Sequence, residues 1–103
     1  MNKYRVDFQS IKWESPIKGV RQKVFKEGQK QIRLVEYSQE MSSHWCEKGH
    51  WGCILEGVFE IEFADGKQVF KAGDGVFIPD GNQNRHNAKV VSDKVIALFV
   101  EDI

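Results

Sequence analysis

The sequence is short of the covalent links that stabilise many small extracellular proteins. It has only two cysteines in 103 residues. Two cysteines are too few for a disulfide scaffold, and a reducing compartment would keep both as thiols. A chain of this length can still bury a core without such links. We therefore expect a single domain spanning residues 1–103.

Neither sign of charge is in excess, because 15 basic residues are balanced by 15 acidic ones. Nucleic acids and anionic membranes are bound through an excess of positive charge, so neither partner is expected. No stretch approaches the roughly 20 apolar residues that cross a bilayer, and residues 1–7 lack the apolar core of a signal peptide. These absences predict a cytoplasmic protein.

Sustained helical periodicity is also missing, and short segments of alternating polarity take its place. Phe59, Ile61 and Phe63 alternate with acidic residues, which is typical of a half-buried strand. Gly28 and the pair Asp65–Gly66 supply hairpin turns. The expected strands cover residues 20–25, 31–37, 53–55, 58–63, 67–70, 76–78 and 94–100. Short strands with frequent turns predict an all-β sandwich or small barrel.

Residues 1–15 fit this pattern less well. Phe8, Ile11 and Trp13 give the segment an apolar character without a clear period. It is either an N-terminal arm, which covers an edge of the barrel or reaches a partner subunit, or the first strand of the barrel. The sequence leaves both alternatives open.

Metal-binding residue types gather at one place in the chain. His44, Cys46 and His50 lie within one seven-residue segment, and His86 is the only other histidine. Imidazole and thiolate suit Zn, Fe, Ni or Cu better than Mg or Ca. On an extended strand the first three side chains would project to the same face, unless Gly49 introduces a bulge.

The spacing of these residues resembles the two motifs of the cupin superfamily. The matching positions are His44, Cys46, His50 and Gly57 in the first motif, and Gly73, Pro79, Gly81 and His86 in the second. Cys46 stands where the family has a second histidine, His50 stands where it has glutamate, and His86 comes two residues late. The chain is also similar to small single-domain cupins with a Trp-Cys-x-Lys-Gly-His segment.

This resemblance covers residues 31–100 and implies a single cupin barrel, that is, a double-stranded β-helix or jelly roll. It also implies that His44, Cys46, His50 and His86 hold a divalent transition metal. Four protein ligands would make a closed structural site, whereas catalysis needs an open position. If Cys46 points away, the three histidines form an open site, and this is the arrangement that we expect.

Other side chains are candidates for a substrate pocket beside the metal. Trp45 and Trp51 flank the histidine segment and could form a stacking wall for a small apolar molecule. Arg33 and Tyr37 belong to a strand that would pass the site, where an inward arginine could hold a carboxylate through two hydrogen bonds. Ordinary barrel packing and a solvated strand face are the alternatives.

Three functions follow from this reading. The first is a metal-dependent enzyme, of oxygenase or isomerase type, acting on a small organic molecule. The second is a non-catalytic sensor or binding module for a small ligand, and the third is a structural cupin with a closed metal site or none. We also expect a homodimer, because a small barrel with exposed sheet edges and an apolar arm has surfaces to pair.

Overall fold

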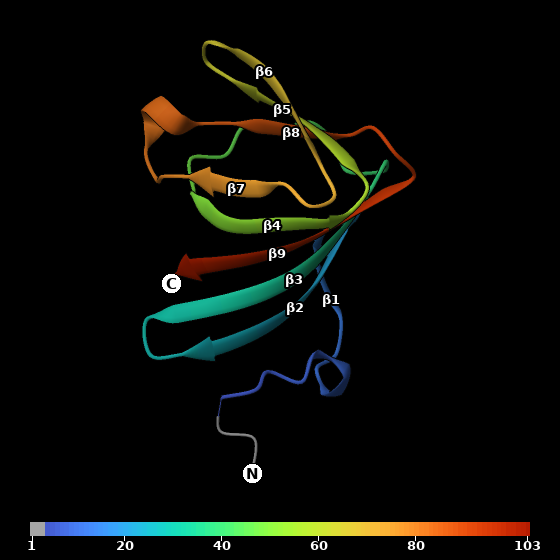
Figure 1. The fold of residues 1–103 in the computed structure, drawn as a ribbon, viewed down its shortest axis with the longest axis vertical. Coiled ribbons are helices and arrows are strands. Elements are labelled where there is room, and N and C mark those ends of the chain that lie inside the picture. Colours follow the sequence, from blue (N-terminus) through green and yellow to red (C-terminus); the bar gives the residue numbers. More distant parts are fainter. Residues whose placement is uncertain (1–3) are drawn as a thin grey trace.

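The computed structural model describes residues 4–103, and its regular structure is almost entirely β (Figure 1). The elements in chain order are η1 (Phe8–Ser10), β1 (Glu14–Ile17), β2 (Val20–Glu27), β3 (Lys30–Ser38), β4 (His50–Glu56), β5 (Val58–Phe63), β6 (Gly66–Lys71), β7 (Gly75–Ile78), η2 (Asn82–Asn84), β8 (Asn87–Val90) and β9 (Lys94–Asp102). Both η elements are single 3-10 turns. In this part of the chain, no helix has the length and apolar character to span a membrane.

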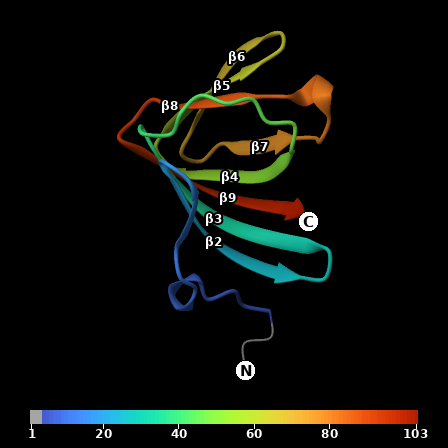
Figure 2. The ribbon, with the colours of Figure 1, turned by 180° about the vertical axis from the view of Figure 1, so that it is seen from behind.

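The strands form two antiparallel sheets. The larger sheet has the order β1-β2-β3-β9-β4-β7, and the smaller has the order β6-β5-β8. In both views β5 and β8 lie above β7 and β4, with β9, β3 and β2 below them (Figures 1 and 2). The expected all-β jelly roll is confirmed.

Two hairpins form where the turn residues predict them. Strands β2 and β3 pair in continuous register from Val20↔Tyr37 to Glu27↔Lys30, around Gly28 with its positive φ of 61°. Strands β5 and β6 pair at the predicted hairpin, where Ala64 and Asp65 form the turn and Gly66 begins β6 opposite Phe63. The sequence analysis does not predict β8, because no glycine or proline marks its ends as Gly75 and Pro79 mark those of β7.

The N-terminal segment contains features of both alternatives that the sequence leaves open. Strand β1 is an edge strand paired with β2, so residues 14–15 of the expected arm belong to the sheet. Before it, the ring of Trp13 packs under the guanidinium of Arg21, with 4.1 Å between the guanidinium carbon and the ring centroid. Residues 1–3 of the expected arm lie outside the described residues.

Strand β9 is a central strand of the larger sheet, because it pairs with both β3 and β4. Its residues alternate strictly, so Val95, Ala97 and Phe99 are buried while their neighbours are less so. Glu101 continues this buried face. The predicted strand ends at residue 100, whereas β9 extends to Asp102 and carries the carboxylate of Glu101 into the interior.

Candidate functional site

Three side chains with metal-binding atoms meet inside the barrel. The ligand atoms of Cys46, His50 and His86 all lie within 4.8 Å of one another. Cys46 lies in the loop before β4, His50 is the first residue of β4, and His86 precedes β8. The ring centroids of the two histidines are 5.3 Å apart with an interplanar angle of 73°.

Backbone hydrogen bonds hold the two loops of this cluster together. The N–H of Cys46 donates to the carbonyl of His86 at 2.9 Å, and the N–H of His86 donates to the carbonyl of Cys46 at 3.0 Å. Nearby, the N–H of Gly49 donates to Oδ1 of Asp80 at 2.5 Å. Residues far apart in sequence are thus fixed as an isolated antiparallel bridge.

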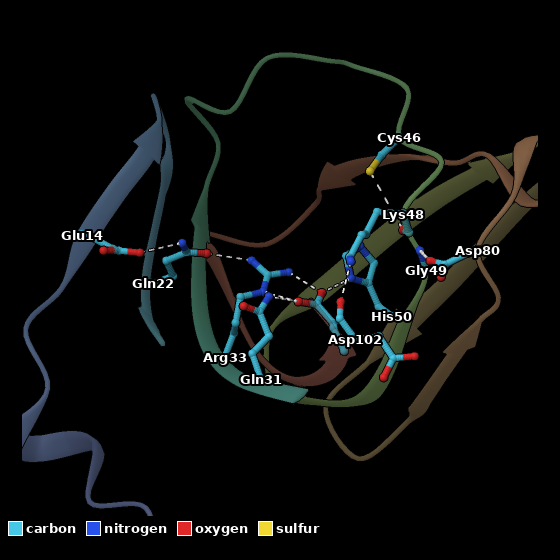
Figure 3. Close-up of polar contacts among 11 residues, drawn as sticks. Glu14, Gln22, Gln31, Arg33, Cys46, Lys48, Gly49, His50, Asp80 and Asp102 are labelled. Atoms are coloured by element: carbon cyan, nitrogen blue, oxygen red, sulfur yellow. Dashed lines mark hydrogen bonds and ion pairs between the residues drawn. The ribbon is translucent and has the colours of Figure 1, made fainter. Parts of the chain in front are cut away.

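The buried carboxylate of Glu101 is hydrogen-bonded to His50. Nδ1 of His50 lies 2.5 Å from Oε2 of Glu101. Arg33 grips the same carboxylate with two hydrogen bonds, from Nε to Oε1 and from Nη2 to Oε2, both 2.7 Å. Figure 3 shows the Arg33 side chain on β3 and the His50 side chain on β4 pointing toward each other. Gln31 donates a further bond to Oε1 at 2.7 Å.

This network keeps Glu101 ionised. Burial alone would raise the pKa of Glu101, but hydrogen bonds from His50 and Arg33, and the charge of Arg33, lower it to about 2. Burial acts to lower the pKa of Arg33, and its bonds to Glu101 raise it overall. Because an ionised carboxylate only accepts hydrogen bonds, Nδ1 of His50 carries a proton in this contact, so Nε2 is the ring nitrogen that can bind a metal.

His86 is arranged in the same way. Its Nδ1 lies 3.1 Å from the carbonyl oxygen of Asn84, to which it donates. Burial lowers the pKa of His86, the Asn84 bond opposes this, and the neighbouring His50 and His44 lower it further. The imidazole is therefore neutral near pH 7, with its Nε2 lone pair unprotonated. Metal-binding histidines in proteins characteristically donate their other ring N–H to a carboxylate or carbonyl in this manner.

The residues present fit a transition metal. One sulfur and two imidazole nitrogens are the donors that Zn, Fe, Ni and Cu prefer. Three protein ligands also leave coordination positions for water or a substrate, as catalytic sites require. The structure thus brings together Cys46, His50 and His86 of the four predicted ligands.

His44 lies outside this group. It lines the same cavity, but its Nδ1 is 3.1 Å from the carbonyl of Ser42, and its backbone N–H is bonded to Oδ1 of Asn87. The expected three-histidine arrangement, with Cys46 turned away, is not the one observed. The reason is the bridge to His86, which turns Cys46 into the cluster.

The cluster opens onto a cavity of about 410 Å³ between the two sheets. Apolar side chains of both sheets line it, including Ile61 of β5 and Phe99 of β9. Arg33 and Tyr37 also line it, in the place where the sequence predicts a substrate pocket. The guanidinium fork of Arg33 is occupied by Glu101, however, and is not available to hold a substrate carboxylate through two bonds.

Neither predicted tryptophan is among the residues that line this cavity. Trp51 follows His50 on β4 and therefore faces outward, where it stacks on Phe77 with 5.7 Å between ring centroids. Trp45 is half-exposed, and the guanidinium carbon of Arg85 lies 5.9 Å from its ring centroid. The expected stacking wall inside the pocket is not formed by these side chains.

The sequence analysis misses Glu101, which is the residue that orients His50. One signal could have revealed it: Glu101 has the same parity as the buried residues Val95, Ala97 and Phe99. A carboxylate in phase with a buried apolar face needs a partner, since burying an unpaired charge is costly. The inward Arg33 of the neighbouring strand is that partner.

Comparison with known proteins supports the fold. No family model matches the chain, and neither does any curated protein. Solved structures that resemble it include KdgF from Halomonas sp. (TM-score 0.72, 18% identity, 89% of this chain and 86% of that chain). A sugar phosphate isomerase of the cupin superfamily from Silicibacter pomeroyi also has a TM-score of 0.72, with 18% identity over 93% of this chain and 73% of that one. An RmlC-like cupin from Shewanella frigidimarina has a TM-score of 0.72, with 16% identity over 95% and 90% of the two chains.

Proposed function

We propose that this protein, which has the cupin fold, is a metal-dependent enzyme that acts on a small organic molecule in its barrel cavity, by chemistry of isomerase or oxygenase type. One observation carries this proposal. Cys46, His50 and His86 present their ligand atoms together at the cavity, and the Nδ1 atoms of both histidines are already hydrogen-bonded. A cluster prepared in this way, with room beside it, is what a catalytic metal site needs.

Each part of the cavity has a task in this proposal. A transition metal supplies a Lewis acid that polarises an oxygen of the substrate, or a site that binds O2. Glu101 and Arg33 hold His50 in one tautomer and orientation. The apolar walls, to which Ile61 and Phe99 contribute, exclude water from the bound molecule.

A second candidate function is a binding module that senses a small ligand without turnover. The observation in its favour is the state of the acidic groups. Among the described residues that line the cavity, Glu101 is the only carboxylate, and it is fully engaged by His50, Arg33 and Gln31. A general base for proton transfer would therefore have to be one of the histidines or a metal-bound water.

We expect the metal to depend on the cluster and not on His44. Purified without a histidine tag and reconstituted anaerobically, the protein should bind about one equivalent of a transition metal. His50→Ala and His86→Ala each remove one ligand and should abolish stoichiometric binding, while His44→Ala, as the matched control, should retain it. Elemental analysis after desalting gives the stoichiometry. Cobalt(II) absorption adds a specific readout, because a thiolate charge-transfer band should disappear in Cys46→Ser.

Two results would contradict this assignment. If the wild type takes up none of Fe(II), Ni, Cu or Zn, the metal-dependent enzyme is excluded. The sensor function is then tested by searching for small ligands that raise the melting temperature of the protein. If His44→Ala loses the metal while Cys46→Ser keeps it, the ligands are the three histidines.

A further inference from the structure

Tyr37 has a hydroxyl group that the fold leaves without a hydrogen-bond partner. The residue lies on the inner face of β3, opposite Val20 and Val95. Its ring packs against Phe59, with 4.7 Å between centroids. Within residues 4–103, nothing accepts from or donates to its hydroxyl oxygen, although tyrosine hydroxyls inside proteins usually find a partner.

This hydroxyl faces the cavity and is not sealed in the core. Among the described residues, every side-chain oxygen or nitrogen that is fully buried has a hydrogen-bond partner. The Tyr37 hydroxyl has no such partner, so it is not fully buried and is accessible from the cavity that Tyr37 lines. Burial raises the pKa of Tyr37 to about 12, against the opposing charge of Arg33. The group is therefore a neutral phenol, able to donate, over the whole physiological pH range.

Arg33 and Glu101, the two oppositely charged groups that act on Tyr37, neutralise each other. Arg33 and Glu101 form an ion pair at 2.7 Å, with 15% and 2% of their side chains exposed. The remaining Nη1 of Arg33 donates to Gln22 at 2.7 Å. Lys48 donates from Nζ to the carbonyl of Asp102 at 2.5 Å. Arg33 is thus not free to bind an anionic ligand, and Lys48 is the remaining lysine or arginine among the described residues that line the cavity.

We propose that the ligand is a small, uncharged, mostly apolar carbonyl compound whose oxygen accepts a hydrogen bond from Tyr37. This inference rests on the proposed function and names its substrate class. Because Arg33 is already paired with Glu101, a phosphate dianion would have, apart from the metal, Lys48 as its one lysine or arginine partner among the described residues that line the cavity, so sugar phosphates are disfavoured. The cavity volume of about 410 Å³ and its apolar walls suit a small molecule with a compact apolar skeleton, which would contact Phe59 and Phe99.

The test compares the wild type with Tyr37→Phe, which removes only the hydroxyl. Cyclohexanone serves as a neutral carbonyl probe, toluene as a probe of similar size without an acceptor, and glucose 6-phosphate as the anionic probe. Binding is followed by NMR titration of the protein. Tyr37→Phe should weaken cyclohexanone binding about three- to tenfold, the value of one neutral hydrogen bond. Toluene affinity should change less than about twofold, and glucose 6-phosphate should not saturate either protein.

Control measurements separate a ligand contact from a structural role. Tyr4 is 91% exposed and does not line the cavity, so Tyr4→Phe should leave cyclohexanone binding unchanged. A melting temperature of Tyr37→Phe equal to or above that of the wild type is expected, because no protein bond is lost. Metal uptake should also match the wild type.

Three outcomes would overturn the inference. The first is that cyclohexanone shows no saturable binding to the wild type. The second is that Tyr37→Phe loses equal affinity for both neutral probes. The third is that glucose 6-phosphate binds saturably. The titrations are run on both metal-free and metal-loaded protein. If no metal binds at all, the proposed enzyme function fails, and the metal-free titrations still decide the role of Tyr37.

Discussion

Replacing Glu101 with alanine should lower the free energy of unfolding by about 3–5 kcal/mol. Removing one member of a buried ion pair leaves the other charge without compensation, and this is the usual size of that cost. Arg33 would keep its charge inside the barrel with only Gln22 as a partner. Chemical denaturation of the metal-free protein measures the change, which is a large fraction of the stability of a domain this small.

Two further variants test the reason for this loss. Arg33→Leu combined with Glu101→Leu removes both charges, so it should recover most of the stability lost in the single variant. Glu36→Gln is the surface control, because Glu36 pairs with Arg21 on the outer face of the sheet and its loss should cost less than about 1 kcal/mol. A double variant as unstable as Glu101→Ala would show that packing, and not the unpaired charge, sets the cost.

The same variants separate stability from metal binding. The double leucine variant regains stability, but Nδ1 of His50 no longer has its acceptor at 2.5 Å. Losing such a partner of a metal-binding histidine typically lowers metal affinity about 10- to 100-fold. We therefore expect a stable protein with weakened metal binding, measured by competition with a chelator. Unchanged affinity would mean that Glu101 has no part in orienting His50.

Glu101 should also make the stability of the metal-free protein sensitive to acid. Its pKa is about 2 in the folded protein and about 4.5 as the ordinary value, so the folded state favours the ionised form. The sign follows: this contribution is complete above about pH 4.5 and is lost as the pH falls toward 2. The difference corresponds to about 3 kcal/mol. Glu101→Gln should lose this part of the pH dependence, as seen by denaturation across that range.

The strands are predictable from the sequence because local chemistry determines them. Gly28 and Asp65–Gly66 mark two hairpins that the structure contains, and the alternation in residues 58–63 gives β5 its bounds. These features depend on turn conformations and on the period of side chains in a strand, both of which are read over a few residues. Strand β8 is not predicted because no glycine or proline lies at its ends to mark a turn.

The site is only partly predictable, because its geometry depends on contacts between distant segments. The residue types and spacing identify His50, His86 and Cys46 as candidates. Which of Cys46 and His44 enters the cluster is decided by the backbone bridge between Cys46 and His86. The outward turn of Trp51 follows from strand parity once His50 is known to face inward. The ion pair between Arg33 and Glu101 joins two strands whose pairing no local pattern reveals.

Gly52→Ala should disrupt this arrangement more severely than its small size suggests. A Cβ at position 52 would lie 1.8 Å from the backbone carbonyl oxygen of Leu98, so β4 and β9 could not keep their present spacing. These two strands carry His50 and Glu101, and backbone atoms cannot rotate away as a side chain can. We expect a loss of about 3 kcal/mol or more in the free energy of unfolding, or no folded protein at all.

Gly75→Ala is the matched control for this substitution. Gly75 lies on the neighbouring strand β7, paired with Cys53, and a Cβ there would meet nothing nearer than the Gly52 carbonyl oxygen at 3.8 Å. Neither glycine has a positive φ, so the two variants differ in the space available and not in backbone conformation. Gly75→Ala should therefore be neutral or slightly stabilising. Similar thermal denaturation midpoints for the two variants would show that β4 and β9 can separate freely, and the rigid placement of His50 against Glu101 would then lose its structural basis.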